Sequence, residues 1–417
     1  MMLIRLNQVD KFDQAFSYCL LNDRHQPGVI VMFEYFRGNY VWNLATNLTL
    51  GSGGLIGEID TVARSIVDAG LRNDDPAQEE WVQAFMRLAG HVHEQARRDE
   101  QAGHLQSAGR KLMRAANYYF AAERQTHPKD PRKTMLYKTM LECFQKGATW
   151  RREPIEWVEI PYEGKTMPAL FVPSGLPGRS PCMIHFDGLD VNKETIYLSG
   201  IATEARRRGV AMLIVDHPGV GEALRLRGMH GTHQIEKAAT ASMDWLEQRT
   251  DVDAERVGIM ALSLGGYYAP RAAAFEKRLK CCIAFGAQWN WHRTVLARLS
   301  PNATTQRSVS HFAEHLNFVF GKATIEESLQ EIQHFNLESV AAKITCPFLV
   351  VHGENDRQVP LADAQALYQA AVNSLQRELR VFTIDEGGAE HCQADNGSLA
   401  ADYMADWFAR VLGGQVA

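Results

Sequence analysis

Short apolar runs alternate with helical stretches from about residue 156 onward, and this alternation restricts the possible folds more than any other feature of the chain. Two runs, WVEIPY and PALFVP, predict an opening antiparallel pair of strands. Later runs predict buried strands at 182–186, 211–216, 257–262, 281–286, 348–353 and 379–384. Helical patterns lie between most of them, at 194–208, 230–249, 265–277 and 362–376. This order predicts an α/β fold: a mostly parallel, doubly wound sheet with helices on both faces.

One connection is too long for this scheme. Residues 288–340, between the sixth strand and the next one, carry a helical pattern of their own. Because a simple crossover needs far fewer residues, we expect an insertion here that forms part of a cap over the site.

Residues 1–150 have a different, helical texture. Apolar residues recur at three- and four-residue spacing between Trp81 and Trp150, and breaks fall at Ala102-Gly103 and at the HPKDP turn, 127–131. The sequence therefore predicts two domains, a helical N-terminal cap domain (1–150) and an α/β catalytic domain (151–417). A length of 417 residues agrees with one large and one smaller domain.

Composition excludes several classes of protein. The net charge is only −5, and no basic stretch predicts nucleic-acid binding. No run of about 18 apolar residues predicts a membrane span, and the N-terminus has no signal-peptide pattern. The seven cysteines form no CxxC pair, which favours reduced thiols in a cytoplasmic protein. Nucleotide-binding glycine motifs are absent from suitable contexts, so we expect no cofactor and no metal.

The string Met260-Ala-Leu-Ser263-Leu-Gly265-Gly266 follows a predicted strand and opens a predicted helix. This context is typical of a nucleophile elbow, where small residues two before and two after the serine let the backbone pass closely. Alanine at 261 replaces the usual first glycine and is its smallest substitute. Ser263 is therefore the predicted nucleophile.

An acid and a histidine should follow the serine in that order, each in a loop after a later strand. Asp356 follows the strand 348–353, and His391 follows the strand 379–384 in a glycine-rich loop. Glu354 is a local competitor for the acid. His217 is a competitor for the base, although it precedes the serine and so breaks the expected order. We predict the triad Ser263, His391 and Asp356.

Acyl chemistry also needs N–H donors for the oxyanion. The residue after the nucleophile, Leu264, should supply one of them. The loop after the strand 182–186 should supply the other, from Gly188 or Leu189, and the sequence leaves this choice open.

Five strings together resemble one branch of the α/β hydrolases: FDGLDVNKET, DHPGVGE, ALSLGGYYAPR, HGENDRQVP and GGAEHCQ. This branch contains 2,6-dihydroxypseudooxynicotine hydrolase, fungal polyketide-shortening hydrolases of the yellowish-green pigment type and the fermentation–respiration switch protein. The resemblance covers most of the chain from about residue 80 and implies the same triad and oxyanion pair.

The resemblance also implies a reaction, because several members of the branch hydrolyse a carbon–carbon bond next to a ketone. We expect a small-molecule substrate of the β-dicarbonyl, polyketide or aryl-ketone type. Side chains that could line its site are Glu34, Tyr118, Tyr119, Trp289, Trp291 and His292. Each has an alternative interpretation; Tyr118 and Tyr119, for example, are also typical helix-packing aromatics.

Two other functions stay open at this point. A carboxylesterase or an acyltransferase would use the same triad with a different acyl acceptor. A regulatory binding protein would use the fold only as a scaffold, which the complete triad disfavours. A homodimer is expected from the helical cap with its apolar residues.

Overall fold

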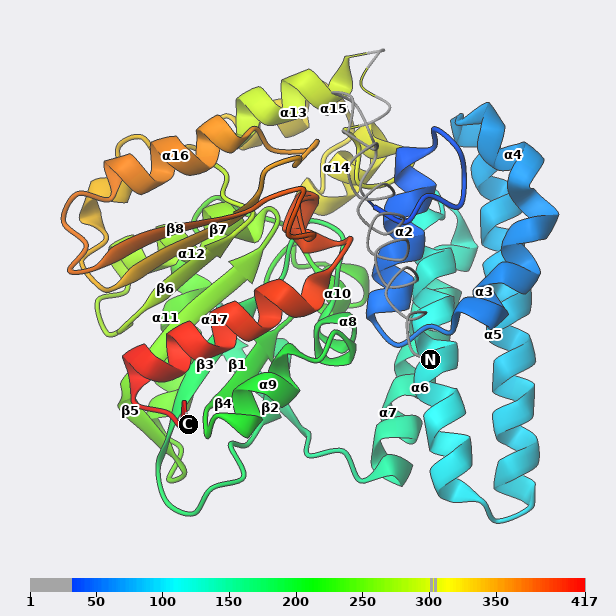
Figure 1. Cartoon of the computed structure of the whole chain (residues 1–417), viewed down its shortest axis with the longest axis horizontal. Coiled ribbons are helices and arrows are strands. Elements are labelled where there is room, and N and C mark those ends of the chain that lie inside the picture. Colours follow the sequence, from blue (N-terminus) through cyan, green and yellow to red (C-terminus); the bar gives the residue numbers. More distant parts are fainter. Residues whose placement is uncertain (1–31, 301–302, 304–305, 417) are drawn as a thin grey trace, which may run out of the picture. The chain divides into compact units, whose positions relative to one another are not determined.

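The computed structural model describes residues 32–300, 303 and 306–416, and Met32–Ala417 forms one compact unit (Figure 1). The predictions for residues 1–31, Cys19 among them, lie outside the described residues. Helical and sheet regions belong to the same unit, so the domain boundary between 150 and 151 stays a prediction.

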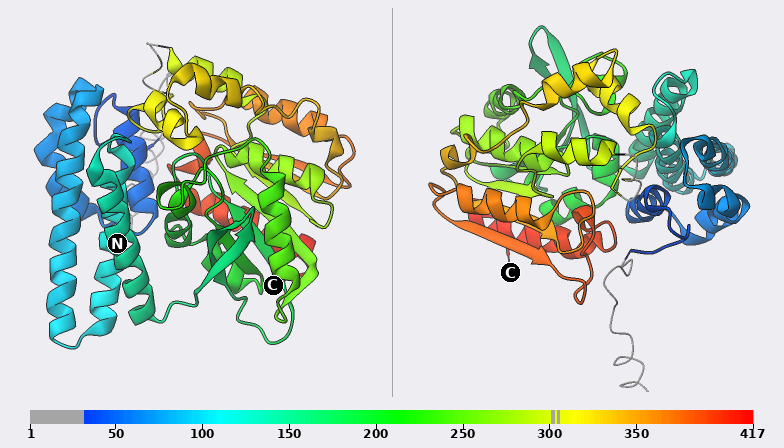
Figure 2. Two further views of the ribbon diagram at one scale, coloured as in Figure 1. Left: turned by 180° about the vertical axis from the view of Figure 1, so that it is seen from behind. Right: turned by 90° about the horizontal axis from the view of Figure 1, so that it is seen from above.

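The first part of this unit is helical, as predicted. The helix α5 ends just before Gly103, whose φ of +75° an L side chain rarely adopts. At the second predicted break, Asp130 caps α7 through its side chain and Pro131 occupies the first helical position. Figure 2 shows the three long helices of this region, α5, α6 and α7, packed side by side. The helices of this region are α2 (Tyr40–Gly51), α3 (Ile56–Ala63), α4 (Val67–Arg72), α5 (Gln78–Gln101), α6 (Leu105–Gln125) and α7 (Pro131–Arg151).

Eight strands then form one sheet in the order β1-β2-β4-β3-β5-β6-β7-β8. The pairs β1/β2 and β2/β4 are antiparallel, and all the other pairs are parallel. The strands are β1 (Glu156–Tyr162), β2 (Lys165–Val172), β3 (Ser180–Phe186), β4 (Ala211–Val215), β5 (Val252–Leu262), β6 (Cys282–Phe285), β7 (Phe348–Gly353) and β8 (Arg377–Phe382). This is the predicted α/β-hydrolase fold, and each predicted strand is present.

Alternate residues of the central strands enter two separate cores, because successive side chains of a strand point to opposite faces. On β5, for example, Ile259 and Ala261 pack on one face and Met260 on the other. The first face is covered by α11 (Glu236–Glu247), α12 (Gly265–Phe275) and α16 (Leu361–Ala370). The second face is covered by α8 (Lys193–Leu198), α9 (Ile201–Arg207) and α17 (Gly397–Leu412), with residues of α6 and α7.

Three predicted helices differ in their bounds, and one of them, predicted for 362–376, ends at Ala370. The stretch 194–208 is split into α8 and α9 at Gly200, which has a φ of +90°. The stretch 230–249 becomes helical only at Glu236. The residues before it form a loop held by the N–H of Gly231, which donates to the carbonyl oxygen of Val319.

The insertion after β6 is helical, as predicted. It contains α13 (Trp291–Leu299), α14 (Phe312–Phe320) and α15 (Ile325–Ile332). Its apolar residues join the core of the first sheet face rather than forming a separate one. The insertion is therefore fixed to the sheet by packing.

Buried ion pairs connect the helical region to the sheet region. Glu123, at the end of α6, is fully buried and lies 2.7 Å from Arg225 of the short helix α10 (Gly221–Arg225) and 3.1 Å from Lys133. Burial alone would raise the pKa of Glu123, but the two cations lower it to about 2. The carboxylate is therefore charged at neutral pH and joins the two regions.

Among the described residues, no helix is both long and apolar enough to cross a membrane. The same residues contain no group of three or more His, Cys, Asp or Glu side chains arranged to hold a metal ion.

Candidate active site

Ser263 occupies the sharp turn between β5 and α12. Its φ is +60°, in the left-handed region that a non-glycine residue rarely adopts. Its N–H donates to the carbonyl oxygen of Phe285 on the neighbouring strand at 2.7 Å, which holds the strained backbone in place. The residue is partly exposed and directly follows the last residue of β5, at the carboxyl end of the sheet.

The small residues around Ser263 are required by direct contacts. A Cβ at Gly265 would lie 2.5 Å from the methyl group of Ala261, and one at Gly266 would lie 2.2 Å from the carbonyl oxygen of Gly286. Neither distance is sterically possible. Alanine is accepted at 261 because glycine stands opposite it at 265.

His391 and Asp356 continue from the serine in a line of hydrogen bonds. His391 Nε2 lies 2.8 Å from Ser263 Oγ, and His391 Nδ1 lies 2.7 Å from Asp356 Oδ2. The other oxygen of Asp356 accepts from the N–H groups of Gln358 and Val359 at 2.8 and 2.9 Å. The carboxylate is thereby fixed in one orientation, and it fixes the imidazole in turn.

Asp356 and His391 each stabilise the charged form of the other. Burial would raise the pKa of Asp356, but the nearby His391 more than offsets this and lowers it to about 2. Burial would lower the pKa of His391, but the Asp356 carboxylate reverses the effect and holds that pKa above its ordinary value. Asp356 is therefore a carboxylate at neutral pH, and it favours a positive charge on His391.

The loop after β3 borders the serine directly. A Cβ at Gly188 would lie 2.9 Å from Ser263 Cβ, so only glycine fits at this position. No protein acceptor within the described ranges receives the N–H of Gly188, Leu189 or Leu264. These N–H groups have the location and the freedom that oxyanion donors need. The choice between Gly188 and Leu189 is still open.

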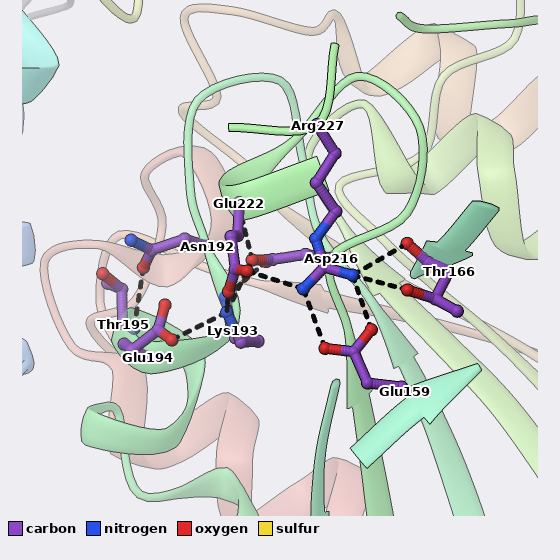
Figure 3. A network of polar contacts seen from close by, with 9 residues as sticks. All are labelled: Glu159, Thr166, Asn192, Lys193, Glu194, Thr195, Asp216, Glu222 and Arg227. Atoms are coloured by element: carbon purple, nitrogen blue, oxygen red, sulfur yellow. Dashed lines mark hydrogen bonds and ion pairs between the residues drawn. The ribbon is translucent and has the colours of Figure 1, made fainter. Parts of the chain in front are cut away.

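Lys193 anchors this loop to the rest of the sheet (Figure 3). Its N–H donates to Asp216 Oδ1 at 2.9 Å. Its Nζ lies 2.8 Å from Glu194, 3.0 Å from Asp216 and 3.1 Å from Glu222. Arg227 extends the network by pairing with Glu222 at 2.6 Å. The loop that carries Gly188 thus ends at Lys193, which is held in place by ion pairs with these carboxylates.

The helical region reaches the same loops. Arg124 of α6 pairs with Asp190 at 2.7 Å, directly after the candidate oxyanion residues. The hydroxyl of Tyr40 in α2 accepts from the side-chain amide of Gln358, two residues after Asp356. The cap helices therefore contact both the oxyanion loop and the acid loop.

The competitors for the acid and the base make other contacts. Glu354 is exposed, and its Oε2 accepts from the N–H of Ile384 at 3.0 Å. His217 is buried, with its ring nitrogens 2.9 and 3.2 Å from the carbonyl oxygens of Pro218 and Asp187. Burial lowers the pKa of His217 to about 4, so its imidazole is neutral and structural at neutral pH.

The structure gives three of the expected lining residues contacts within the helical region instead. Glu34 is exposed, and its Oε1 accepts from a backbone N–H four residues later. Tyr118 is fully buried and donates to Glu58 Oε2 at 2.7 Å. The hydroxyl of Tyr119 lies 3.4 Å from Nδ1 of His93.

The three expected lining residues that follow β6 (Trp289, Trp291 and His292) differ in burial and contacts. Trp291 is buried and packs in the core against Phe320 and Phe335, with ring centroids 5.9 and 5.1 Å apart. Trp289 is partly buried against the same core, and His292 is partly exposed in the first turn of α13. Trp291 is therefore a packing residue of the core and not a lining residue of the site.

Sequence reasoning missed two buried polar side chains near the triad loops, Arg298 and Gln288. Both are at most 3% exposed. A signal was present for Arg298, because it stands seven residues after Trp291 on the buried face of α13. Gln288 lies three residues after the end of β6 and had no such signal.

Comparisons with known proteins agree with the fold. Residues 201–415 match the prolyl oligopeptidase family. The chain is 30% identical over 348 residues to 2,6-dihydropseudooxynicotine hydrolase of Paenarthrobacter nicotinovorans, covering 81% of this chain and 86% of that protein. It is 29% identical to 20-hydroxy-prefusarin hydrolase of Gibberella moniliformis, covering 84% and 89%. The crystal structure of 2,6-dihydroxy-pseudo-oxynicotine hydrolase superimposes with a TM-score of 0.72 at 26% identity, covering 89% of this chain and 97% of that one.

Proposed function

Because this chain is a hydrolytic enzyme with the α/β-hydrolase fold and belongs to the prolyl oligopeptidase family, we propose that Ser263, His391 and Asp356 are its catalytic triad. The observation that carries the proposal is the unbroken line of hydrogen bonds from Ser263 Oγ through His391 to Asp356, at 2.8 and 2.7 Å. A non-catalytic scaffold is not retained, since the chain is an enzyme.

The roles follow from the contacts. Ser263 Oγ attacks the substrate carbonyl carbon while His391 Nε2 takes its proton. Asp356 holds the imidazole by Nδ1 and stabilises the imidazolium that forms. The N–H of Leu264 and one N–H from Gly188 or Leu189 receive the oxyanion.

We propose that the bond cleaved is a carbon–carbon bond next to a ketone in a β-dicarbonyl or polyketide-like substrate. The tetrahedral intermediate collapses, and the electron pair of that bond moves onto the leaving carbon as an enolate. The imidazolium of His391 returns its proton to this carbon, which releases a ketone. Water then hydrolyses the acyl-serine, so that one substrate and one water give a carboxylic acid and a ketone. Two relatives named as hydrolases of a pseudooxynicotine and of a prefusarin compound support this choice.

The test uses a fluorophosphonate probe beside a substrate panel: p-nitrophenyl esters, 1-phenyl-1,3-butanedione and a naphthopyrone-type polyketide. We expect one adduct on Ser263, none in Ser263→Ala, and cleavage of the diketone or the polyketide to an acid and a ketone. Turnover of esters alone would favour a carboxylesterase, and transfer to an added alcohol or amine would favour an acyltransferase. No adduct on Ser263 would refute the triad.

The homodimer and the cytoplasmic location also stay predictions. Sedimentation equilibrium at several concentrations tests the first, because a dimer doubles the 46.8 kDa mass of the chain.

A further inference from the structure

Arg298 is a buried cation on the insertion that follows β6. The buried face of α13 consists of Trp291, Thr294, Val295 and Arg298, at the spacing of one helix face. Arg298 is only 3% exposed. Arg293 of the same helix lies about 140° away around the axis and is 63% exposed, paired with Asp363. The helix therefore directs one arginine outward and the other inward.

The buried guanidinium has fewer partners than donors. Arg298 Nη2 donates to the carbonyl oxygen of Gln358 at 2.9 Å, while Nε has no acceptor. No carboxylate of the described residues lies within 4.0 Å of it. The carboxylates whose charges reach it are already engaged, Asp356 by His391 and Asp190 by Arg124 at 2.7 Å each.

The surroundings of Arg298 belong to the active centre. Burial lowers its pKa, and this effect is opposed by Asp356 on the acid loop, by Tyr40 of α2 and by Asp190 on the oxyanion loop. Cys392 Sγ lies 3.6 Å from His391 Nε2. The guanidinium thus contacts the acid loop through Gln358, and the charges of Asp356 and Asp190 act on it.

Two further side chains with unpaired polar atoms lie on the acid loop and in the segment after β6. The Oε1 of Gln358 is buried and accepts no hydrogen bond, although its Nε2 donates to the hydroxyl of Tyr40 at 3.0 Å. Both amide atoms of Gln288, after β6, are buried without partners. Buried polar groups in native proteins are nearly always paired with protein, water or ligand, so these groups are available to hydrogen-bond a polar ligand.

We propose that Arg298 binds the second carbonyl oxygen of a β-dicarbonyl substrate, the oxygen that becomes the enolate oxygen when the carbon–carbon bond breaks. This inference rests on the proposed function and adds the substrate group that the site selects. A guanidinium is planar, permanently charged and rich in donors, so it can stabilise the negative charge that develops on this oxygen. When the carbon–carbon bond breaks, the electron pair reaches the enolate oxygen, to which Arg298 donates. The proton from His391 then goes to carbon.

The experiment compares kcat/KM on 1-phenyl-1,3-butanedione with kcat/KM on p-nitrophenyl acetate, whose leaving group is not an enolate. In Arg298→Gln we expect the diketone-to-ester ratio to fall about 10- to 100-fold, the worth of a hydrogen bond to a charged group. Arg298→Lys should recover part of the ratio. Arg293→Gln, on the outer face of the same helix, should leave both activities unchanged. Complete labelling of Ser263 by the fluorophosphonate probe shows that each variant is folded.

An equal fall on both substrates would overturn the proposal, because it would make Arg298 a structural residue. If the wild-type enzyme turns over esters but cleaves no diketone, the proposed carbon–carbon activity fails by itself. The anion site is then tested by inhibition of ester turnover with 3-phenylpropanoate and with its neutral amide. Inhibition by the acid that is at least 10-fold weaker in Arg298→Gln, with no change for the amide, supports the site. Equal inhibition of both proteins by the acid overturns it.

Discussion

Replacement of Lys193 by methionine tests the anchor of the oxyanion loop. The Lys193 side chain is 2% exposed and contacts three carboxylates at 2.8, 3.0 and 3.1 Å; those of Glu194 and Asp216 are at most 3% exposed. Removing one partner of a buried ion pair costs about 3–5 kcal/mol, because the remaining charge stays without compensation. Because Lys193→Met leaves two buried carboxylates without their cation, we expect its loss of unfolding free energy to lie in this range.

The matched control is Lys237→Met. Lys237 also pairs with a carboxylate, Glu163 at 3.2 Å, but the two side chains are 52% and 58% exposed. An exposed pair contributes about 0–1 kcal/mol. Urea unfolding followed by tryptophan fluorescence gives both free energies of unfolding under the same conditions.

The pH dependence adds a second criterion. Burial raises the pKa of Glu194 to about 7 even with Lys193 present. Without the cation, the pKa values of the remaining carboxyl groups rise further, so folding of the variant requires more proton uptake. The stability difference between wild type and Lys193→Met should therefore be small at pH 5 and grow toward pH 8. We also expect kcat to fall by up to about 10²-fold, as when one oxyanion donor is lost. A loss below about 1 kcal/mol at pH 8, or one that does not vary with pH, would refute the reasoning.

Three further predictions concern the site and the cap. Gly188→Ala should lower kcat by at least about 10²-fold, because its Cβ would lie 2.9 Å from Ser263 Cβ and displace the loop; normal kcat would contradict the loop position. Asp356→Asn should lower kcat by about 10⁴-fold. It should also shift the acid limb of the pH–rate profile to lower pH, because without the carboxylate burial alone lowers the pKa of His391. An unshifted acid limb in stopped-flow ester assays would count against the pairing of Asp356 with His391. Glu123→Gln should cost about 3–5 kcal/mol in urea unfolding, as two buried cations lose their carboxylate, and a neutral result would show that the pair contributes nothing net.

The strand set and the elbow could be predicted because their signals are local. Every strand run is a short apolar segment, and the small residues around Ser263 are adjacent in sequence. The same holds for Asp356 and His391, since a residue just after a parallel strand always lies at the carboxyl edge of the sheet. The structure brings these three side chains into hydrogen-bond contact, and their catalytic roles stay proposals.

The lining of the site could not be predicted in the same way. An aromatic residue at helical spacing faces a core as readily as a cavity, and Trp291 and Tyr118 both face cores. Whether Arg298 lies inside or outside depends on how the insertion packs on the sheet, which involves residues far apart in the chain. The pair of Glu123 with Arg225 spans 102 positions and leaves no local pattern.

The last turn of α6 has a consequence for how the two regions communicate. A helix is stiff along its axis, and the last turn of α6 carries Glu123 and Arg124. These two residues pair with Arg225 and Asp190 of the sheet region. A tilt of α6 would move Asp190, and with it the loop that borders Ser263. The position of the helical region would then affect the geometry of the oxyanion donors. Substitutions in α6 that are far from Ser263 should therefore change the turnover number more than the apparent affinity for substrate.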